Sequence, residues 1–190
     1  MPSELPAVAL VPGTPEDEWL TVALETDPDV MSELGGPWTV DEARATHHRR
    51  IAGSRDNAFW SFTVRPTADG QVGEPVGTIG VWDSEWEGEP ISETGWMTLS
   101  GHQGKGYASA ALAAILERER AESRWGDIHA FPGASNAPSN ALCRKFGFEL
   151  VGGGDADYAG RHFPVNHWVW RAGTPVTTGV ERSGGSASAR

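Results

Sequence analysis

The sequence contains very little cysteine: Cys143 is the single one among 190 residues, so no internal disulfide can form. It also has no run of about 18 apolar residues, the length at which a helix can cross a bilayer. Its first residues, Met-Pro-Ser-Glu, show no basic region followed by an apolar stretch, the pattern of a secretory signal. These absences predict a reducing compartment, no membrane association and a cytoplasmic location.

Basic residues are scarce as well. The chain has 15 lysines and arginines against 26 aspartates and glutamates, which gives a net charge of −11. Nucleic-acid binding needs basic patches that displace counterions, so this balance argues against a nucleic-acid partner. The balance is compatible with a cationic substrate, which an acidic surface concentrates, and equally with solubility alone. The histidines, including the pair His47-His48, lack the spacing of metal ligands, so no metal is expected.

Residues 103–108, with the sequence Gln-Gly-Lys-Gly-Tyr-Ala, are the most informative segment. A strand-like run precedes them, and apolar residues at helical spacing follow from Ala108 to Ile115. A strand, a glycine loop and a helix together turn free backbone N–H groups and the positive helix end toward an anion. Gly104 and Gly106 allow a sharp bend and the close approach of a phosphate. The segment predicts a site for a pyrophosphate.

Two familiar phosphate-binding motifs do not fit this segment. A Walker loop needs Gly-x-x-x-x-Gly-Lys-Ser/Thr, which does not occur in the sequence. A dinucleotide fingerprint needs a third glycine where Ser109 stands, and no acidic residue follows about 20 residues further on. Taken alone, the segment could also be a glycine-rich turn that opens an ordinary helix.

A second segment, residues 136–148, reads Asn-Ala-Pro-Ser-Asn-Ala-Leu-Cys-Arg-Lys-Phe-Gly-Phe. Asn136 suits a helix N-cap, Pro138 suits the first turn, and Gly147 suits a helix stop before a new strand. The segment is similar in order and spacing to Asn-x-x-Ser-x-x-Leu-Tyr-x-Lys-x-Gly-Phe, a signature of the GNAT acetyltransferases.

The glycine loop matches the other signature of that family, Gln/Arg-x-x-Gly-x-Gly/Ala, at Gln103, Gly106 and Ala108. The chain therefore resembles a GNAT N-acetyltransferase over residues 5–171, nearest to the branch of the ribosomal-protein-alanine N-acetyltransferases. The resemblance implies that acetyl-CoA is the co-substrate and that a primary amine, on a peptide N-terminus or a small molecule, attacks it directly. It implies cofactor contacts from the strand edge, the loop and the second motif, namely Met97, Thr98, Leu99, Gln103, Gly104, Lys105, Gly106, Tyr107, Ala108, Asn136 and Asn140.

Acetyl transfer to an amine needs a base and a proton donor for the leaving thiolate. Glu93 is the expected base, because it precedes the cofactor strand where relatives often carry Glu-x-Gly; Glu85, Glu87 and Asp83 are alternatives. Cys143 stands where relatives often carry a tyrosine that faces the thiolate, and a thiol is a weaker and shorter donor. Either the leaving group takes its proton from water or from the attacking amine, or Ser139, Asn136 or another residue substitutes for the tyrosine. Cys143 itself is then buried filler, with an acetyl-enzyme at Cys143 as a further alternative to direct attack.

The chain has nine tryptophans, many for its length. Trp38, Trp82 and Trp86 are expected near the acceptor amine together with Glu85, since aromatic walls hold aliphatic or cationic groups. Core packing is the alternative for each tryptophan. In such proteins the last strand often pairs across a homodimer, so we expect Trp168 or Trp170 at such an interface.

The pattern along the chain predicts a single α/β domain over residues 1–171. Its fold class is GNAT-like: a mixed, mostly antiparallel central sheet, splayed at the cofactor site and flanked by helices. Residues 83–90 and 153–161 are expected to be loops. Residues 172–190 are rich in glycine, threonine and serine and are expected to be a disordered tail.

Two other functions remain open at this point. A non-catalytic acyl-CoA sensor would keep the fold without the acid, and an interaction protein would carry the glycine loop incidentally. Binding of acetyl-CoA separates the interaction protein from the other two, and thiol release with amines separates the enzyme from the sensor.

Overall fold

A computed structural model describes residues 5–55, 59–158 and 160–176. Its strands are β1 (Val8–Pro12), β2 (Phe59–Ala68), β3 (Gln71–Val72), β4 (Gly77–Trp86), β5 (Glu89–Thr98), β6 (Ile128–Ala130), β7 (Glu149–Tyr158) and β8 (Arg161–Trp170). Its helices are α1 (Glu18–Glu25), α2 (Pro28–Met31), α3 (Val40–Arg55), α4 (Tyr107–Glu122) and α5 (Ala137–Lys145), with short 3-10 helices at Pro15–Asp17 and Ser100–His102.

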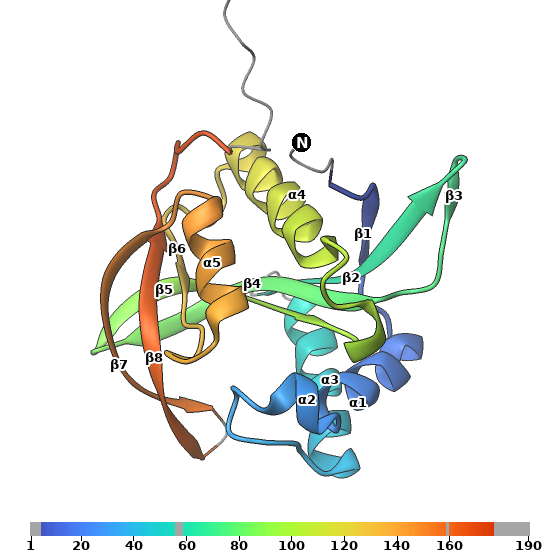
Figure 1. Cartoon of the computed structure of the whole chain (residues 1–190), viewed down its shortest axis with the longest axis horizontal. Coiled ribbons are helices and arrows are strands. Elements are labelled where there is room, and N and C mark those ends of the chain that lie inside the picture. The colour runs from blue at the N-terminus through green and yellow to red at the C-terminus, as the bar shows by residue number, and fades with distance from the viewer. Residues whose placement is uncertain (1–4, 56–58, 159, 177–190) are drawn as a thin grey trace, which may run out of the picture.

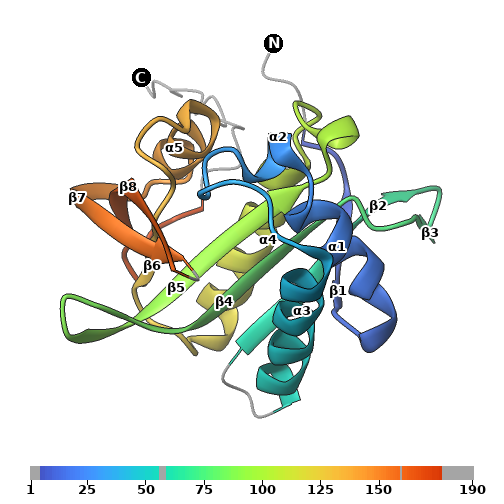
Figure 2. The ribbon, with the colours of Figure 1, turned by 90° about the horizontal axis from the view of Figure 1, so that it is seen from below.

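The strands form one sheet in the order β1-β2-β4-β5-β6-β8-β7, with β3 paired to the far end of β2. The β5–β6 pair is parallel and the other pairs are antiparallel. Helices α4 and α5 lie on one face of the sheet and α1, α2 and α3 on the other (Figures 1 and 2). The predicted mixed, mostly antiparallel α/β fold is confirmed.

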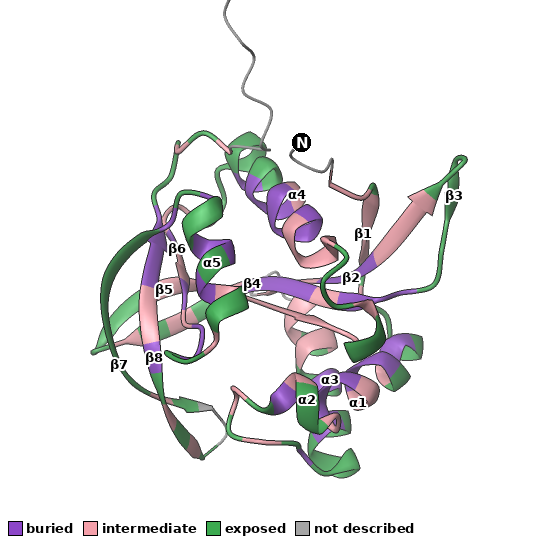
Figure 3. Ribbon diagram, in the orientation of Figure 1, coloured by how far each residue is buried: buried purple, intermediate pink, exposed green. Residues whose placement is uncertain are grey.

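The main hydrophobic core lies between the sheet and α4. Alternate residues of β2 and β4, such as Trp60, Phe62 and Val81, point to this side and are buried against Leu112 and Ile115 of α4. Figure 3 shows the buried side of α4 turned toward the sheet. Burial of this apolar layer is the main force that fixes α4, and with it the glycine loop at its start.

The opposite sheet face, beneath α1 and α3, is built from smaller and more polar residues. Ser61 and Thr63 of β2 and Thr78 and Gly80 of β4 occupy the positions between the core residues, and all of them line a cleft. A backbone without large side chains leaves space between sheet and helices, so this face accommodates a ligand rather than a second full core.

Helix starts agree with the sequence pattern in three places. Asn136 caps α5 by accepting a hydrogen bond from the backbone N–H of Ser139. Thr39 and Glu42, whose spacing suits a capping box, form one before α3. The segment after Thr14 begins as a 3-10 helix before α1, because Thr14 and Asp17 close a tight capping turn first.

Two predicted loops are wrong, because both are long hairpins. Residues 83–90 continue β4 and β5 as far as Trp86 and Glu89, and residues 153–161 continue β7 and β8. The first hairpin turns at Glu87 and Gly88, which both have positive φ, 53° and 83°. Such a two-residue turn matches the twist of the two strands, so the polar residues on either side of it continue the hydrogen-bonded pairing of β4 with β5.

The expected interface position of Trp168 or Trp170 is also wrong. Strand β8 lies between β6 and β7, and both tryptophans are buried in the core of the single chain, with exposures of 4% and 0%. The homodimer itself stays a prediction, but Trp168 and Trp170 are not part of its interface. In the described part of the chain no helix is long and apolar enough to span a membrane. Most of the expected disordered tail, residues 177–190, lies outside the described residues.

Candidate active site

The sheet opens at the middle of β5. Strands β5 and β6 pair only at Ser92 with Ile128 and at Glu93 with His129. From residue 94 onward β5 keeps β4 as its neighbour on one side, while β6 diverges on the other side. Unpaired strand-edge groups must find other partners, so this edge can bind an extended ligand through its backbone.

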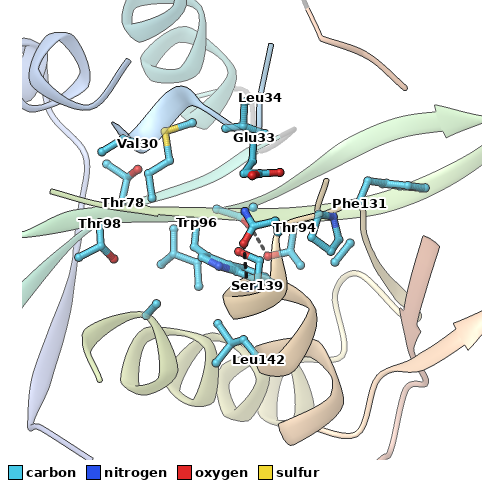
Figure 4. Close-up of a pocket in the computed structure, with 18 of the residues that line it drawn as sticks. Val30, Glu33, Leu34, Thr78, Thr94, Trp96, Thr98, Phe131, Ser139 and Leu142 are labelled. Atoms are coloured by element: carbon cyan, nitrogen blue, oxygen red, sulfur yellow. Dashed lines mark hydrogen bonds between the residues drawn. The ribbon is translucent and has the colours of Figure 1, made fainter. Parts of the chain in front are cut away.

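A cleft of about 1060 Å³ lies at this opening and extends to both faces of the sheet. Figure 4 shows Glu33 and Leu34 on one side of β5, and Ser139 and Leu142 of α5 on the other. A volume of this size is sufficient for a large cofactor fragment and a small acceptor together. Residues predicted to bind the cofactor and residues predicted to bind the acceptor amine therefore line the same cavity.

The glycine loop and the start of α4 form one end of the cleft. The first backbone hydrogen bond of α4 joins the N–H of Ala110 to the carbonyl of Gly106, so the N–H groups of residues 107–109 lie at the open helix end. Gly104 has φ of +71°, and a Cβ there would enter open space. The lining residues include Gln103, Gly104, Gly106, Tyr107 and Ala108. This end fits an anionic group such as a pyrophosphate.

Gly106 is required for a different reason from the one that its motif suggests. Its φ is +84°, and a Cβ would lie 3.0 Å from Cδ of Pro6 rather than in the cleft. Lys105 and Leu99 are not among the cleft residues, and Lys105 donates through Nζ to the carbonyl of Gly101. Met97 and Thr98 do line the cleft.

Helix α5 contributes Asn136 and Ser139 to the cleft, and Ser139 lies opposite Thr94 and Trp96 of β5 (Figure 4). Asn140 does not reach the cleft. Its amide donates to the carbonyls of Gly133 and Asn136, and its oxygen accepts from Asn166 and Trp168. These bonds make Asn140 a structural anchor of the loop before α5.

Glu93 lies at the point where β5 and β6 separate, and its side chain lines the cleft. It faces Trp82 across the β4–β5 ladder. Burial raises the pKa of the Glu93 carboxyl above its ordinary value, although hydrogen bonds with Ser84 and Trp82 lower the pKa in part. A raised pKa makes the ionised carboxylate a stronger base, which suits the role predicted from the sequence.

Cys143 is placed differently from the expectation. Its side chain is fully buried, belongs to the hydrophobic core between sheet and helices, and does not line the cleft. Burial raises the pKa of the thiol to about 12, so the group stays protonated near neutral pH. In this arrangement Cys143 thus packs in the core and not on the cleft surface, as the alternative of buried filler would have it.

Trp82, Glu85 and Trp86, which were predicted to lie near the acceptor amine, line the cleft. Trp82 stacks on Phe59 with ring centroids 5.2 Å apart, and Trp86 packs on Phe131 at 4.5 Å. Trp38 is not part of this wall. It is 6% exposed and is fixed through its backbone N–H to the carbonyl of Glu25, 2.8 Å away.

Sequence reasoning missed cleft residues that come from distant loops. Glu33 follows α2, while Phe131 and Ser135 follow β6. The Ser135 hydroxyl donates to the Glu33 carboxylate, 102 residues away in the chain. No local motif marks these positions, because only the tertiary fold brings them together.

The comparisons with known proteins agree with this geometry. The family model described as "Acetyltransferase (GNAT) domain" matches residues 8–149. The chain belongs to the GNAT acetyltransferases, so it is an acyltransferase whose co-substrate is acetyl-CoA. The uncharacterized protein YkkB of Bacillus subtilis (strain 168) is 27% identical over 124 residues, which cover 65% of this chain and 70% of that protein.

Solved structures show the same fold at low sequence identity. RimL, a ribosomal-protein alpha-N-acetyltransferase in complex with coenzyme A, has a TM-score of 0.69 at 16% identity, over 90% of this chain and 97% of that chain. Spermidine N-acetyltransferase from Vibrio cholerae, in complex with CoA and spermine, has a TM-score of 0.68 at 19% identity, over 86% of this chain and 95% of that chain. Their acceptors differ, so the fold alone does not select an acceptor.

Proposed function

We propose that this protein acetylates a primary amine by direct attack on acetyl-CoA, with Glu93 as the general base. The observation that carries the proposal is the position of Glu93. Its carboxyl group lines the cleft where β5 leaves β6, and burial raises its pKa. A base at this position can take the proton of an ammonium group, directly or through a water molecule.

Two features of the cleft support the proposed mode of cofactor binding. The open N–H groups at the start of α4 and the glycine loop would hold the pyrophosphate. The β5 edge at Met97 and Thr98 would pair with the amide groups of the pantetheine arm. Both contacts use backbone groups, so they depend on chain conformation more than on side-chain identity.

Acetyl-CoA supplies the acyl group: its thioester C–S bond breaks as the amine nitrogen bonds to the acetyl carbon, and the coenzyme leaves as a thiolate that takes up a proton from solvent. Glu93 receives the proton that the amine loses. Ser139 is the proposed donor toward the departing sulfur, because its half-buried side chain lies across the cleft from Trp96. A hydroxyl donates one hydrogen bond and needs no change of charge for this role.

The test is a thiol-release assay with a panel of amines, carried out on the parent protein, Glu93→Gln and Glu85→Gln. Glu93→Gln keeps the size of the side chain but removes proton acceptance, so turnover should fall about 10²–10⁴-fold while acetyl-CoA binding stays nearly unchanged. Glu85 also lines the cleft and is exposed, so Glu85→Gln is the matched loss of charge; as an acceptor contact it should change mainly the KM for the amine and keep kcat near that of the parent. Equal turnover in all three proteins would remove Glu93 from the reaction.

A second candidate function is favoured by the burial of Cys143. The position at which relatives often carry tyrosine holds a buried thiol that does not line the cleft, which suits a protein that binds acyl-CoA and does not turn it over. That function predicts thermal stabilisation by acetyl-CoA without thiol release for any amine. Thiol release with one amine of the panel would exclude it.

A further inference from the structure

Residues 33–37, which we call the strap, connect α2 to α3 and lie against the loop between β6 and α5. The Ser135 hydroxyl donates a hydrogen bond to the Glu33 carboxylate. A Cβ on Gly133 would lie only 2.9 Å from the carbonyl oxygen of Glu33, so the two backbones are in close contact. Glu33 and Ser135 both line the cleft.

The other end of the strap is fixed by Arg161, at the start of β8. The Arg161 guanidinium donates through Nη1 to the carbonyls of Gly35 (3.2 Å), Gly36 and Pro37 (2.9 Å). Gly35 and Gly36 have φ of +82° and +91°, and a Cβ on Gly35 would lie 2.8 Å from Cβ of Arg161. The strap is thus held between two separate loops, and its glycines permit the close approach.

The charges around the cleft are strongly unequal. Among the described residues that line it, Arg50 is the only arginine or lysine, and it forms an ion pair with the buried Glu25 at 2.8 Å. The carboxylates that line the cleft are Asp17, Asp29, Glu33, Glu85, Glu93, Asp155 and Asp157. Asp17 is paired with Arg65. Glu33 and Glu93 thus lie in one cavity whose described lining holds no lysine, and no arginine other than Arg50.

We propose that Glu33 is a specificity-determining residue that selects acceptors with a second positive charge. This inference rests on the proposed function: the reacting amine lies at Glu93, and the second cationic group of the same acceptor pairs with Glu33. Trp86 and Phe131, which pack on each other and line the same cleft, offer an apolar surface to the aliphatic linker between the two charges. The acceptor class is therefore a diamine, or a peptide N-terminus with a lysine next to it.

Two contacts give Glu33 a defined direction. Ser135 holds its carboxylate, and Arg161 holds the backbone of the strap behind it. Arg161 does not line the cleft, so it is a positioning residue and does not touch the acceptor. A fixed carboxylate loses less side-chain freedom on binding than a mobile one, which makes the ion pair more favourable.

The experiment compares matched acceptors that differ in one charge. 1,4-Diaminobutane is compared with butylamine, and an Ala-Lys dipeptide amide with an Ala-norleucine dipeptide amide, by thiol release at fixed, saturating acetyl-CoA. The parent protein should show a kcat/KM about tenfold higher for the dication of at least one pair. The pair that shows the preference distinguishes a small diamine from a peptide N-terminus.

Glu33→Gln should reduce this preference to about twofold or less, mainly through a higher KM for the dication, with kcat for butylamine retained. Glu74→Gln removes the same charge from an exposed residue outside the cleft and should keep the full preference. Arg161→Ala should weaken the preference without changing the KM for acetyl-CoA. Added salt should lower the preference in the parent protein, because it screens a partly exposed ion pair.

The outcomes separate this inference from the function on which it rests. Turnover of monoamines and dications at equal kcat/KM would overturn the role of Glu33 and leave the acetyltransferase proposal standing. A full preference in Glu33→Gln would assign the selection to another carboxylate and overturn the inference as well. Absence of turnover with every amine, in a protein that still binds acetyl-CoA, would overturn both.

Discussion

His129 Nδ1 lies 2.8 Å from His167 Nε2, between strands β6 and β8 at the edge of the cleft region. One ring must donate to the other, so at least one of them is neutral, because two imidazolium N–H groups would point at each other. Burial, followed by the nearby His129 and Arg171, lowers the pKa of His167 to about 4. Burial lowers the pKa of His129 as well. The pair is therefore neutral near pH 7.

This pair predicts a loss of stability in mild acid. The ordinary histidine pKa is 6.5, so the unfolded chain binds protons at His167 between pH 6.5 and about 4, where the folded chain does not. The free energy of unfolding should then fall as pH decreases through this window and be fully present above it. Urea unfolding at several pH values measures the slope.

His167→Gln should make that slope shallower, because it removes the group with the largest shift. His162→Gln is the control, since His162 is exposed and has Asp157 as its ion-pair partner at 3.3 Å. Identical slopes in the parent and in His167→Gln would contradict the assignment of the titration to His167.

Gly104→Ala is predicted to weaken acetyl-CoA binding. The substitution adds a methyl group to the glycine loop where the pyrophosphate is expected to bind. It also strains the backbone, because the φ of residue 104 is +71°. Gly126→Ala is a matched control, because Gly126 has φ of +70°, has open space around it, and lies outside the cleft. Both variants should lose about 1–2 kcal/mol of stability from the backbone strain. Only Gly104→Ala should raise the dissociation constant for acetyl-CoA, measured by calorimetry below the melting temperature of both variants.

Alanine substitutions of Ser139 and Cys143 are predicted to differ in the thiol-release assay. Ser139→Ala should lower turnover about tenfold or more if the hydroxyl donates toward the sulfur, with little change in melting temperature. Cys143→Ala should leave turnover near that of the parent, because the thiol lies in the core. It should lower the free energy of unfolding by about 1 kcal/mol through lost packing. A fully active Ser139→Ala variant would show that the departing thiolate needs no hydrogen bond from Ser139.

The sequence was sufficient for the parts of the site that lie within local motifs. The glycine loop, the cap at Asn136 and the position of Glu93 each follow from residues within a few positions of one another, so their local pattern determines their structure. The direction of the side chain at position 143 could not be predicted from the motif. Relatives often carry a tyrosine there that faces the cofactor, whereas the small thiol of Cys143 packs into the core. Glu33 and Arg161 could not be predicted, since their contacts join loops far apart in the chain.

The two hairpins show a related limit at the level of the fold. Residues 83–90 are acidic and polar, which resembles a loop, but β4 and β5 support each other through the ladder from Gly77 to Trp86. Pairing with a neighbour across a tight turn outweighs weak strand propensity. This extension places Trp86 on Phe131, and both line the cleft, so the error in the predicted loop was also an error in the shape of the cleft.

Asn140→Leu is predicted to be strongly destabilising, while its effect on the chemistry is indirect. Asn140 is 8% exposed, and its side chain makes hydrogen bonds of 2.8–2.9 Å with Gly133, Asn136, Asn166 and Trp168. Leucine has a similar size but leaves buried partners unsatisfied, so the free energy of unfolding should fall by about 2–4 kcal/mol in urea titrations.

Asn136→Ala is the matched comparison, since it removes one cap hydrogen bond and should lose only about 1 kcal/mol. If Asn140 anchors the fold rather than binds the cofactor, the folded fraction of Asn140→Leu at low temperature should bind acetyl-CoA with nearly the affinity of the parent. A variant that keeps its stability but loses acetyl-CoA affinity would return Asn140 to the cofactor site. The four hydrogen bonds leave the Asn140 amide no free donor for such a contact, which is why we expect stability to change and affinity to hold.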